Sequence, residues 1–313
     1  MTADLTRSVP FTVIGGYLGA GKTTLINHLL KHADAARLGL IVNDFGAINI
    51  DADLIESADD RKISLTNGCV CCGLSSGIED ALDEILATGP DHILLEASGV
   101  ADVAVLTRYG YLQGLRPNGL IVLADAETVR RKADDKYVAQ SVRRQFKAAD
   151  LIILNKIDLV EGDLDALAEW LRDLAPQASV VPTSRCNLPV ELVLGARTES
   201  EISKPTVSDD PDHRHASYIS WSYETGQVTT LGNLQAFLDA LPFQVLRLKG
   251  YVCLNDGTRK LVQRVGVRTQ IIDAGASAGQ TTRLVALGLQ AQIKPSDLDR
   301  LAHKYLKDEP CSI

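Results

Sequence analysis

In the first two thirds of the chain, apolar residues form short unbroken runs that alternate with amphipathic stretches. Unbroken runs of this length are typical of strands that are buried on both faces. We expect such strands at residues 11–14, 38–42, 93–95, 120–123, 151–154 and 180–181. Between them, apolar residues recur with helical spacing around residues 25–30, 78–85 and 138–146. The alternation predicts an α/β fold with a mostly parallel sheet covered by helices.

The character of the chain changes after residue 195. Residues 196–215 contain two prolines and many polar residues but almost nothing apolar, so we interpret them as a linker. The predicted domains are therefore residues 1–195 and a smaller α+β domain of residues 216–313.

The smaller domain shows both strand and helix patterns. Apolar residues alternate from Ile219 onward, which predicts a strand, and a helical stripe follows at residues 231–241. Two strand-like runs flank the turn signal at residues 255–257. A last helix is predicted to start at Ser296, after Pro295.

Composition narrows the class of protein further. An apolar fraction of 45% can supply a core for each domain. The net charge of -8 argues against a nucleic-acid partner, because phosphate contacts need clustered Lys and Arg. We find neither an N-terminal signal core nor an apolar window of membrane-spanning length. We therefore expect a cytoplasmic protein without a membrane partner.

Residues 16–23 have the sequence Gly-Tyr-Leu-Gly-Ala-Gly-Lys-Thr, which matches the phosphate-loop pattern GxxxxGK[ST] between a predicted strand and a predicted helix. Glycines let backbone N–H groups curl around phosphates, and the helix N-terminus adds positive potential. We expect Lys22 to neutralise the β- and γ-oxygens of the nucleotide and Thr23 to bind Mg²⁺. The other predicted nucleotide contacts in this segment are Gly16, Gly19, Ala20, Gly21 and Thr24.

A second motif, Asn-Lys-Ile-Asp at residues 155–158, begins where a predicted strand ends, at the edge where open α/β sheets place ligands. Asp158 can accept two hydrogen bonds from guanine, whereas adenine would set an acceptor nitrogen against the carboxylate. We therefore predict GTP rather than ATP, and GDP as its product, in contact with Asn155, Lys156 and Asp158. Ser184, after the next strand, is predicted to support the base through backbone contacts.

Glu96 ends a predicted strand and is followed by Ala-Ser-Gly. In P-loop enzymes a carboxylate at this place holds Mg²⁺ through water or orients the attacking water, and a nearby glycine N–H contacts the γ-phosphate. We predict a catalytic role for Glu96, together with Lys22, and a γ-phosphate contact for Gly99. Asp44, after the second strand, is a third catalytic candidate; its alternative role is to cap a turn before Gly46.

Three cysteines, Cys69, Cys71 and Cys72, lie within four residues of one another and between glycines. Thiols that converge in a turning segment suit a soft or borderline ion such as Zn²⁺, although a fourth ligand is missing locally. The alternatives are a redox thiol pair, which usually has CxxC spacing, and inert buried cysteines. We predict a metal site. The other cysteines are interpreted as ordinary packing or surface residues: Cys186, Cys253 and Cys311.

Together these motifs resemble one family, the CobW-type P-loop GTPases, which are grouped with the urease and hydrogenase maturation GTPases. The matching segments occur in that family's order: 16–24, 43–46, 69–72, 96–99 and 155–158. Three more segments resemble its C-terminal domain: 246–250, 263–266 and 283–285. The resemblance covers nearly the whole chain.

The resemblance implies a GTPase that delivers a metal ion to a client metalloprotein, with GTP, Mg²⁺ and Zn²⁺ as the bound species and cobalt also represented in the family. Two departures stand out. Many relatives have glutamates where Val42 and Ala47 stand here, and the histidine-rich linker of relatives is reduced to His213 and His215. Whether the active unit is a monomer or a homodimer stays open.

Other classes remain as alternatives. These are a metal- or redox-responsive nucleotide-binding regulator, a cobalt or iron insertion factor, a structural zinc protein, and a small-molecule kinase, which would leave residues 155–158 without a purpose. Under the preferred interpretation, GTP and Mg²⁺ order the segments around Asp44, the cysteines and Glu96, so metal affinity differs between nucleotide states. Intrinsic turnover should be slow, because no arginine finger is evident in the sequence.

Overall fold

The computed structural model describes most of the chain. The described residues are 8–33, 36–42, 62–65, 75–99, 101–195, 218–274, 281–290 and 293–307. They belong to two compact units, one spanning Ser8–Leu194 and the other containing residues 218–307. Each unit is presented by itself below.

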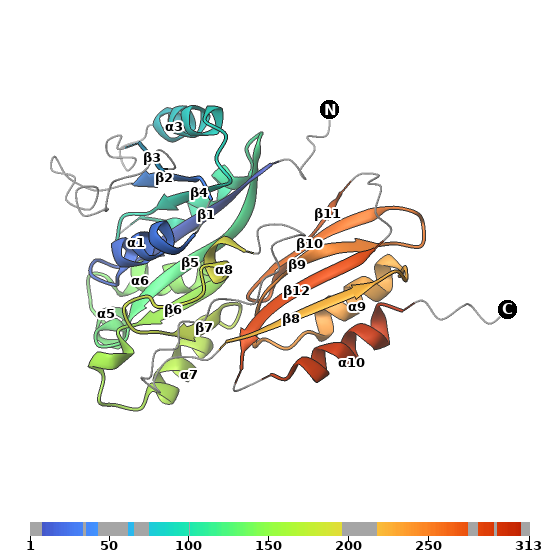
Figure 1. The fold of residues 1–313 in the computed structure, drawn as a ribbon. Helices are drawn as coiled ribbons and strands as arrows, with labels where there is room; N and C mark the ends of the chain where they lie inside the picture. Colours follow the sequence, from blue (N-terminus) through green and yellow to red (C-terminus); the bar gives the residue numbers. More distant parts are fainter. Residues whose placement is uncertain are drawn as a thin grey trace. The chain divides into compact units, whose positions relative to one another are not determined.

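The described part of the first unit is built around a seven-stranded sheet (Figure 1). Its strands are β1 (Val9–Gly16), β2 (Leu38–Val42), β3 (Lys62–Leu65), β4 (His92–Glu96), β5 (Leu115–Asp125), β6 (Leu151–Asn155) and β7 (Ser179–Pro182). The order is β3-β2-β4-β1-β5-β6-β7, and all paired strands are parallel. All six predicted strands form. The apolar pattern does not predict β3, because Lys62 and Ser64 interrupt it.

Helices connect these strands. They are α1 (Lys22–His32), α3 (Ser75–Ala87), α4 (Val103–Leu106), α5 (Val129–Ala133), α6 (Ala139–Ala148), α7 (Leu164–Leu174) and α8 (Glu191–Leu194), with the 3-10 helices η2 (Thr107–Tyr111) and η3 (Ile157–Leu159). The three helices predicted from apolar spacing are α1, α3 and α6. In the part of the chain that the structure describes, no helix combines the length and the apolar character needed to cross a membrane.

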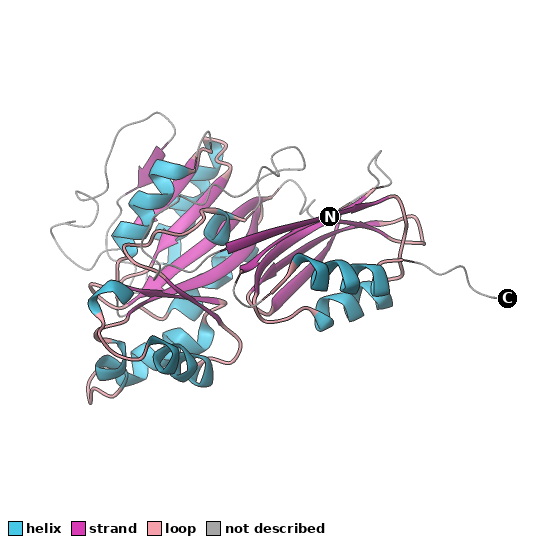
Figure 2. Cartoon of the chain, turned by 60° about the horizontal axis from the view of Figure 1, so that its bottom comes forward, coloured by secondary structure: helices cyan, strands magenta, loops and turns pink. Residues whose placement is uncertain are grey.

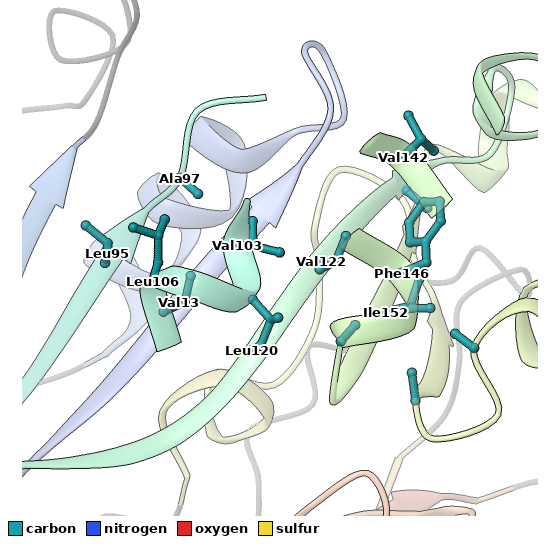
Figure 3. Close-up of a cluster of buried hydrophobic side chains, with 14 of the residues drawn as sticks. Val13, Leu95, Ala97, Val103, Leu106, Leu120, Val122, Val142, Phe146 and Ile152 are labelled. Atoms are coloured by element: carbon teal, nitrogen blue, oxygen red, sulfur yellow. The ribbon is translucent and has the colours of Figure 1, made fainter. Parts of the chain in front are cut away.

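The core of this unit explains the unbroken apolar runs. One face of the sheet packs against α3 to α7 in a single cluster of buried side chains, which includes Val13 of β1 and Phe146 of α6 (Figure 3). Ile14, the next residue of β1, is also buried and lies outside that cluster. Because successive strand residues face opposite sides of a sheet, Ile14 lies on the face opposite Val13. Helices α1 and α8 also contact β1 (Figure 1). The strands β2, β4 and β6 are buried along their whole length, so polar alternation disappears in them.

The strand order places the site. β1 lies between β4 and β5, so the chain moves to one side of β1 first and to the other side afterwards. In open α/β sheets this is the topological switch point, and ligands bind there beyond the carboxyl ends of the strands. The residues that end these neighbouring strands are Gly16, Glu96, Asp125 and Asn155.

The second unit is an antiparallel sheet with two helices. Its strands are β8 (Tyr218–Thr225), β9 (Val245–Cys253), β10 (Arg259–Val265), β11 (Arg268–Asp273) and β12 (Thr282–Leu289), in the order β11-β10-β9-β12-β8. The helices α9 (Leu231–Ala240) and α10 (Pro295–Tyr305) pack on one face of it (Figure 2). Trp221 Nε1 donates to Asp299 Oδ1 at 2.8 Å and joins β8 to α10.

One predicted boundary in this unit is wrong by a residue. α10 starts at Pro295 rather than at Ser296, and Lys294 occupies the position before the helix. Proline suits the first helical position because its φ is already helical and its missing N–H would have no partner there.

Candidate nucleotide site

A pocket of about 550 Å³ lies beyond the carboxyl ends of β1 and β6, and its volume suits a small-molecule ligand. Its lining residues come from two segments that are far apart in the sequence, together with one further loop. They are Leu18, Gly19, Gly21, Lys22, Thr23, Thr24, Asn155, Lys156, Asp158, Leu159 and Arg185. The structure thus brings the predicted phosphate loop and the predicted base-binding tetrapeptide together in one pocket.

The phosphate side of the pocket is set up for an anion. Lys22 is the first residue of α1 and is 7% exposed, and its Nζ donates to the Gly16 carbonyl oxygen at 3.1 Å. The first turn of α1 contains no acidic residue, so the N–H groups at the helix start and the lysine present positive charge together. This arrangement favours phosphate oxygens.

The position directly before α1 requires glycine for two reasons, the backbone conformation of Gly21 and the closeness of a neighbouring side chain. The φ of Gly21 is 105°, in the region that favours glycine, and an added Cβ would lie 2.4 Å from Asn155 Nδ2. Asn155 is 2% exposed and uses both ends of its amide: Nδ2 donates to the Ala20 carbonyl at 3.1 Å, and Oδ1 accepts the Cys186 N–H at 3.0 Å. Asn155 therefore joins the phosphate loop to the loop that follows β7.

Asp158 has the clearest unmet hydrogen-bonding capacity on the base side. Its Oδ1 atom is buried and accepts no hydrogen bond from the described residues. Such an atom costs about 1–3 kcal/mol when it stays unpaired. A ligand with N–H donors, such as guanine, would satisfy it.

Lys156 is held against the pocket wall by a residue that the sequence analysis did not single out. Its Nζ lies 2.7 Å from Asp125 Oδ2, and the Asp125 side chain is only 7% exposed. Asp125 Oδ1 also accepts the Glu127 N–H at 3.0 Å, which fixes the carboxylate. The sequence contained a signal for Asp125, because this carboxylate follows an apolar strand in the same way that Glu96 does.

A second lysine meets the tip of the phosphate loop. Lys132 Nζ donates to the Leu18 carbonyl at 3.1 Å and lies 4.8 Å from the centroid of the Tyr17 ring. Desolvation lowers the pKa of Lys132, Asp125 raises it, and nearby cations that include Lys22 lower it further. The loop therefore has a second positive charge beside it, for which no sequence motif exists.

The loop after β7 contributes Arg185 to the pocket, and the role of Ser184 stays a prediction. Ser184 is buried and does not line the pocket, whereas its neighbour Arg185 does. Arg185 and Cys186 both have positive φ, 51° and 55°, so the loop is tightly turned. Cys186 is fully buried, and its Sγ contacts the Gly21 carbonyl at 3.5 Å. Burial raises the pKa of this thiol to about 12, which fits the predicted packing role.

The predicted catalytic strand end lies next to the phosphate loop. Glu96 pairs with Ile14 across β4 and β1 and is 2% exposed. Gly99 lies so close to the loop that an added Cβ would be 2.9 Å from the Leu18 nitrogen. Neither residue lines the pocket, and the same holds for Gly16 and Ala20.

The predicted zinc ligands Cys69, Cys71 and Cys72 lie outside the described residues. The same holds for the catalytic candidate Asp44 and for four other residues named in the sequence analysis: Ala47, His213, His215 and Cys311. Among the described residues, no three His, Cys, Asp or Glu side chains gather in a way that could hold a metal ion. The zinc site stays a prediction.

The fold and the pocket define a P-loop GTPase. Residues 10–182 match the family model described as CobW/HypB/UreG, nucleotide-binding domain, and residues 218–303 match the cobalamin synthesis protein cobW C-terminal domain. The chain belongs to the CobW/HypB/UreG family, as the motif resemblance predicts.

Relatives of known function are similar over most of their length. A zinc chaperone CobW of Sinorhizobium sp is 32% identical over 333 residues, covering 90% of this chain and 93% of the relative. A zinc chaperone CobW of Pseudomonas aeruginosa is 30% identical over 327 residues, covering 90% and 87%. Among solved structures, the Zn(II)-bound YjiA GTPase from E. coli superimposes with a TM-score of 0.46 at 22% identity, covering 96% of this chain and 99% of that one.

Proposed function

We propose that this protein is a GTP-hydrolysing metallochaperone that binds zinc and transfers it to a client protein under nucleotide control. The observation that carries the proposal is one pocket shared by Lys22 and Asp158, whose buried Oδ1 accepts no hydrogen bond from the described residues. The zinc chaperones at about one third identity support the metal part of the proposal.

The described residues divide the work on GTP. Asp158 accepts the guanine N–H groups, and Lys156, fixed by Asp125, forms the adjoining wall. Lys22 and the first N–H groups of α1 neutralise the phosphates. Lys132 adds positive charge beside the phosphate loop, which favours the negative charge of the bound phosphates. Turnover should still be slow, because no arginine finger is evident in the sequence.

The residues present fit a magnesium ion, which prefers hard oxygen ligands. Thr23 lines the pocket beside Lys22 and would offer its hydroxyl, and Glu96 ends the adjoining strand with a buried carboxylate. Asp44 is the further predicted oxygen donor. When bound, the ion would neutralise charge on the β- and γ-oxygens.

Zinc, or cobalt in the alternative, is the cargo. We assign it to the thiols of Cys69, Cys71 and Cys72. Support for nucleotide control comes from the sheet: Leu65, the end of β3, and Glu96, the end of β4, both lie at the carboxyl edge, since β2 is parallel to both strands. Leu65, the last described residue before the cysteine segment, therefore lies at the same edge of the sheet as the phosphate loop.

The nucleotide part is tested by calorimetry with GTP, ATP and xanthosine triphosphate. The wild-type protein should prefer GTP over ATP by at least about tenfold, since a mispaired buried carboxylate costs more than 1 kcal/mol. Asp158→Asn should lose affinity for GTP and gain it for the xanthine nucleotide. Equal affinities of the wild-type protein for GTP and ATP would contradict the proposal and favour a small-molecule kinase.

The metal part is tested by zinc affinity measured with a non-hydrolysable GTP analogue and with GDP. We expect the two affinities to differ, and linkage requires zinc to change the nucleotide affinities by the same factor. A Cys71→Ser, Cys72→Ser double variant should lose the zinc. No stoichiometric zinc in the reduced wild-type protein would favour a redox regulator, and unfolding on chelation would favour a structural zinc site. Running the titrations with cobalt separates the two cargo ions.

A further inference from the structure

Gln145 lies on α6, outside every motif of the nucleotide site, and is 3% exposed. Both ends of its amide are occupied. Oε1 accepts the Gly16 N–H at 3.0 Å, while Nε2 donates to the Gly99 carbonyl at 3.0 Å and approaches the Ala101 carbonyl at 3.5 Å. Because Gly16 offers a donor and Gly99 an acceptor, only this orientation of the amide satisfies both.

The two segments joined by Gln145 are the ones that would contact the phosphates. Gly16 begins the phosphate loop, and Gly99 follows Glu96 and carries the predicted γ-phosphate contact. They also touch directly, because the Gly99 Cα faces the backbone of Leu18 closely enough that a Cβ would lie 2.9 Å from the Leu18 nitrogen. A shift of one segment therefore changes its position relative to the other.

Packing alone does not explain a glutamine at this position. Its neighbours on α6, Val142 and Phe146, are buried in the apolar core, and an apolar side chain would fill the same space. A buried amide is tolerated only when its polar atoms are satisfied, so this one constrains both of its partners. The amide thus specifies one arrangement of the Gly16 and Gly99 segments.

We infer that Gln145 is a positioning residue that holds the Gly99 segment in register with the phosphate loop, and through this contact sets the preference for GTP over GDP. The inference rests on the proposed function, because it takes Gly99 as the γ-phosphate contact. A ligand shifts a conformational equilibrium only through contacts that differ between states, and the γ-phosphate is the difference between these two nucleotides. Loss of the register lowers affinity for GTP and leaves GDP, which does not reach Gly99, little changed.

The test compares affinities for a non-hydrolysable GTP analogue and for GDP in matched variants of the full chain. Gln145→Leu should lower the ratio of analogue to GDP affinity by roughly five- to tenfold, the effect of losing about one buried hydrogen bond. Arg144→Gln is the matched control. Its side chain meets the same segment through Asp102 at 3.3 Å, but this contact is solvent-exposed and does not reach the phosphate loop, so the ratio should stay unchanged.

A second pair of variants separates positioning from stability. Val142→Ala removes core packing from the same helix and should lower the melting temperature without changing the ratio. Gln145→Glu can still accept from Gly16 but, when ionised, cannot donate to Gly99. In this variant the ratio of GTP-analogue to GDP affinity should fall at high pH and recover at low pH, where the new carboxyl group becomes protonated. The ratio of the wild-type protein should not change with pH in this way.

Two outcomes count against the inference, and they are distinguishable from failure of the proposed function. Equal losses of GTP-analogue and GDP affinity in Gln145→Leu, or a ratio equal to that of the wild-type protein, would overturn it. A pH-independent ratio in Gln145→Glu would overturn it even if Gln145→Leu failed to fold. A wild-type protein that bound no guanine nucleotide would overturn the proposed function and this inference together.

Discussion

Single side chains inside and outside the nucleotide motifs shape the pocket. Asp125 fixes Lys156, Asn155 joins two loops, and Lys132 meets the tip of the phosphate loop. All three contacts lie at the carboxyl edge of the sheet. Substitutions there should change nucleotide binding more than they change stability.

Lys132→Met should weaken binding of the GTP analogue two- to fivefold, since the contact with Tyr17 and the added positive charge are together worth about 0.5–1 kcal/mol at a partly exposed site. Calorimetry at low and high salt checks this, because the loss should shrink as salt screens the charge. Lys136→Met is the control, since Lys136 makes the same kind of contact with Tyr137 away from the loop. Equal losses of GTP-analogue affinity in the two variants would show that the effect comes from the overall charge of the protein and not from contact with the phosphate loop.

Gly21→Ala should destabilise the nucleotide-free protein by about 2 kcal/mol more than Gly19→Ala. Both glycines have positive φ, 105° and 78°, so both variants carry backbone strain. Only at Gly21 does the new methyl group meet Asn155, at 2.4 Å, whereas at Gly19 no atom of the described residues lies within 4 Å. Denaturant unfolding without nucleotide measures the difference. Identical unfolding midpoints would mean that Asn155 moves aside freely.

Among the elements, helix α1 makes a tertiary contact along its length as well as contacts at its N-terminus. His28 Nε2 lies 2.8 Å from the Leu188 carbonyl, which ties α1 to the loop before α8, and the His32 ring lies 4.5 Å from the His28 ring. Desolvation lowers the pKa of His28 from its usual 6.5, the bond to Leu188 raises it, and His32 and Lys31 lower it. Neutral His28 is therefore the form that the folded protein prefers.

This makes stability dependent on pH. Because the folded-state pKa lies below 6.5, the unfolded chain binds more protons at moderately acid pH. The contribution of neutral His28 to the free energy of unfolding is fully present above pH 6.5 and is lost as pH falls below 6.5. For one group, the free energy of unfolding then falls by at most about 1.4 kcal/mol per pH unit. His28→Gln keeps a donor for Leu188 and removes the titration, so its free energy of unfolding should fall less between pH 6.5 and 5. Parallel curves for the two proteins would exclude His28 as the cause.

At the scale of the whole molecule, the chain has two units with separate cores, and we propose that they correspond to the predicted domains 1–195 and 216–313. The chain has two tryptophans, one in each unit: Trp170 on α7 and Trp221 on β8. Trp170 lies beside Arg130, and Trp221 is hydrogen-bonded to α10. Each is a fluorescent reporter of its own unit.

Single-tryptophan variants test whether the units unfold independently. A ligand stabilises what it binds by about 2.7 kcal/mol at one hundred times its dissociation constant. GTP analogue should therefore raise the unfolding midpoint that Trp170 reports in Trp221→Phe more than the midpoint that Trp221 reports in Trp170→Phe. Equal shifts would mean that the chain unfolds as one cooperative body and would contradict the proposal of two domains.

The sequence by itself determined the fold class, the motifs and most strands, because these leave local signals. A strand covered on both faces needs an unbroken apolar run, and the phosphate loop needs its glycines and Lys22 consecutively. β3, β11 and β12 were not predicted, and the helix start at Ser296 was off by one residue. In β3 and β11 polar residues interrupt the apolar pattern, and α10 begins on a proline.

Only the tertiary structure decided which strands are neighbours and which side chains meet across them. Lys156 and Asp125 are 31 residues apart, Lys132 and Leu18 are 114 apart, and Gln145 and Gly16 are 129 apart. Apolar spacing reports how deeply a residue is buried but not its partner, and a polar residue on a helix looks the same in sequence whether it faces water or a buried loop. The order of the parallel strands fixes those partners, since it sets which strand ends share the edge where the nucleotide pocket lies.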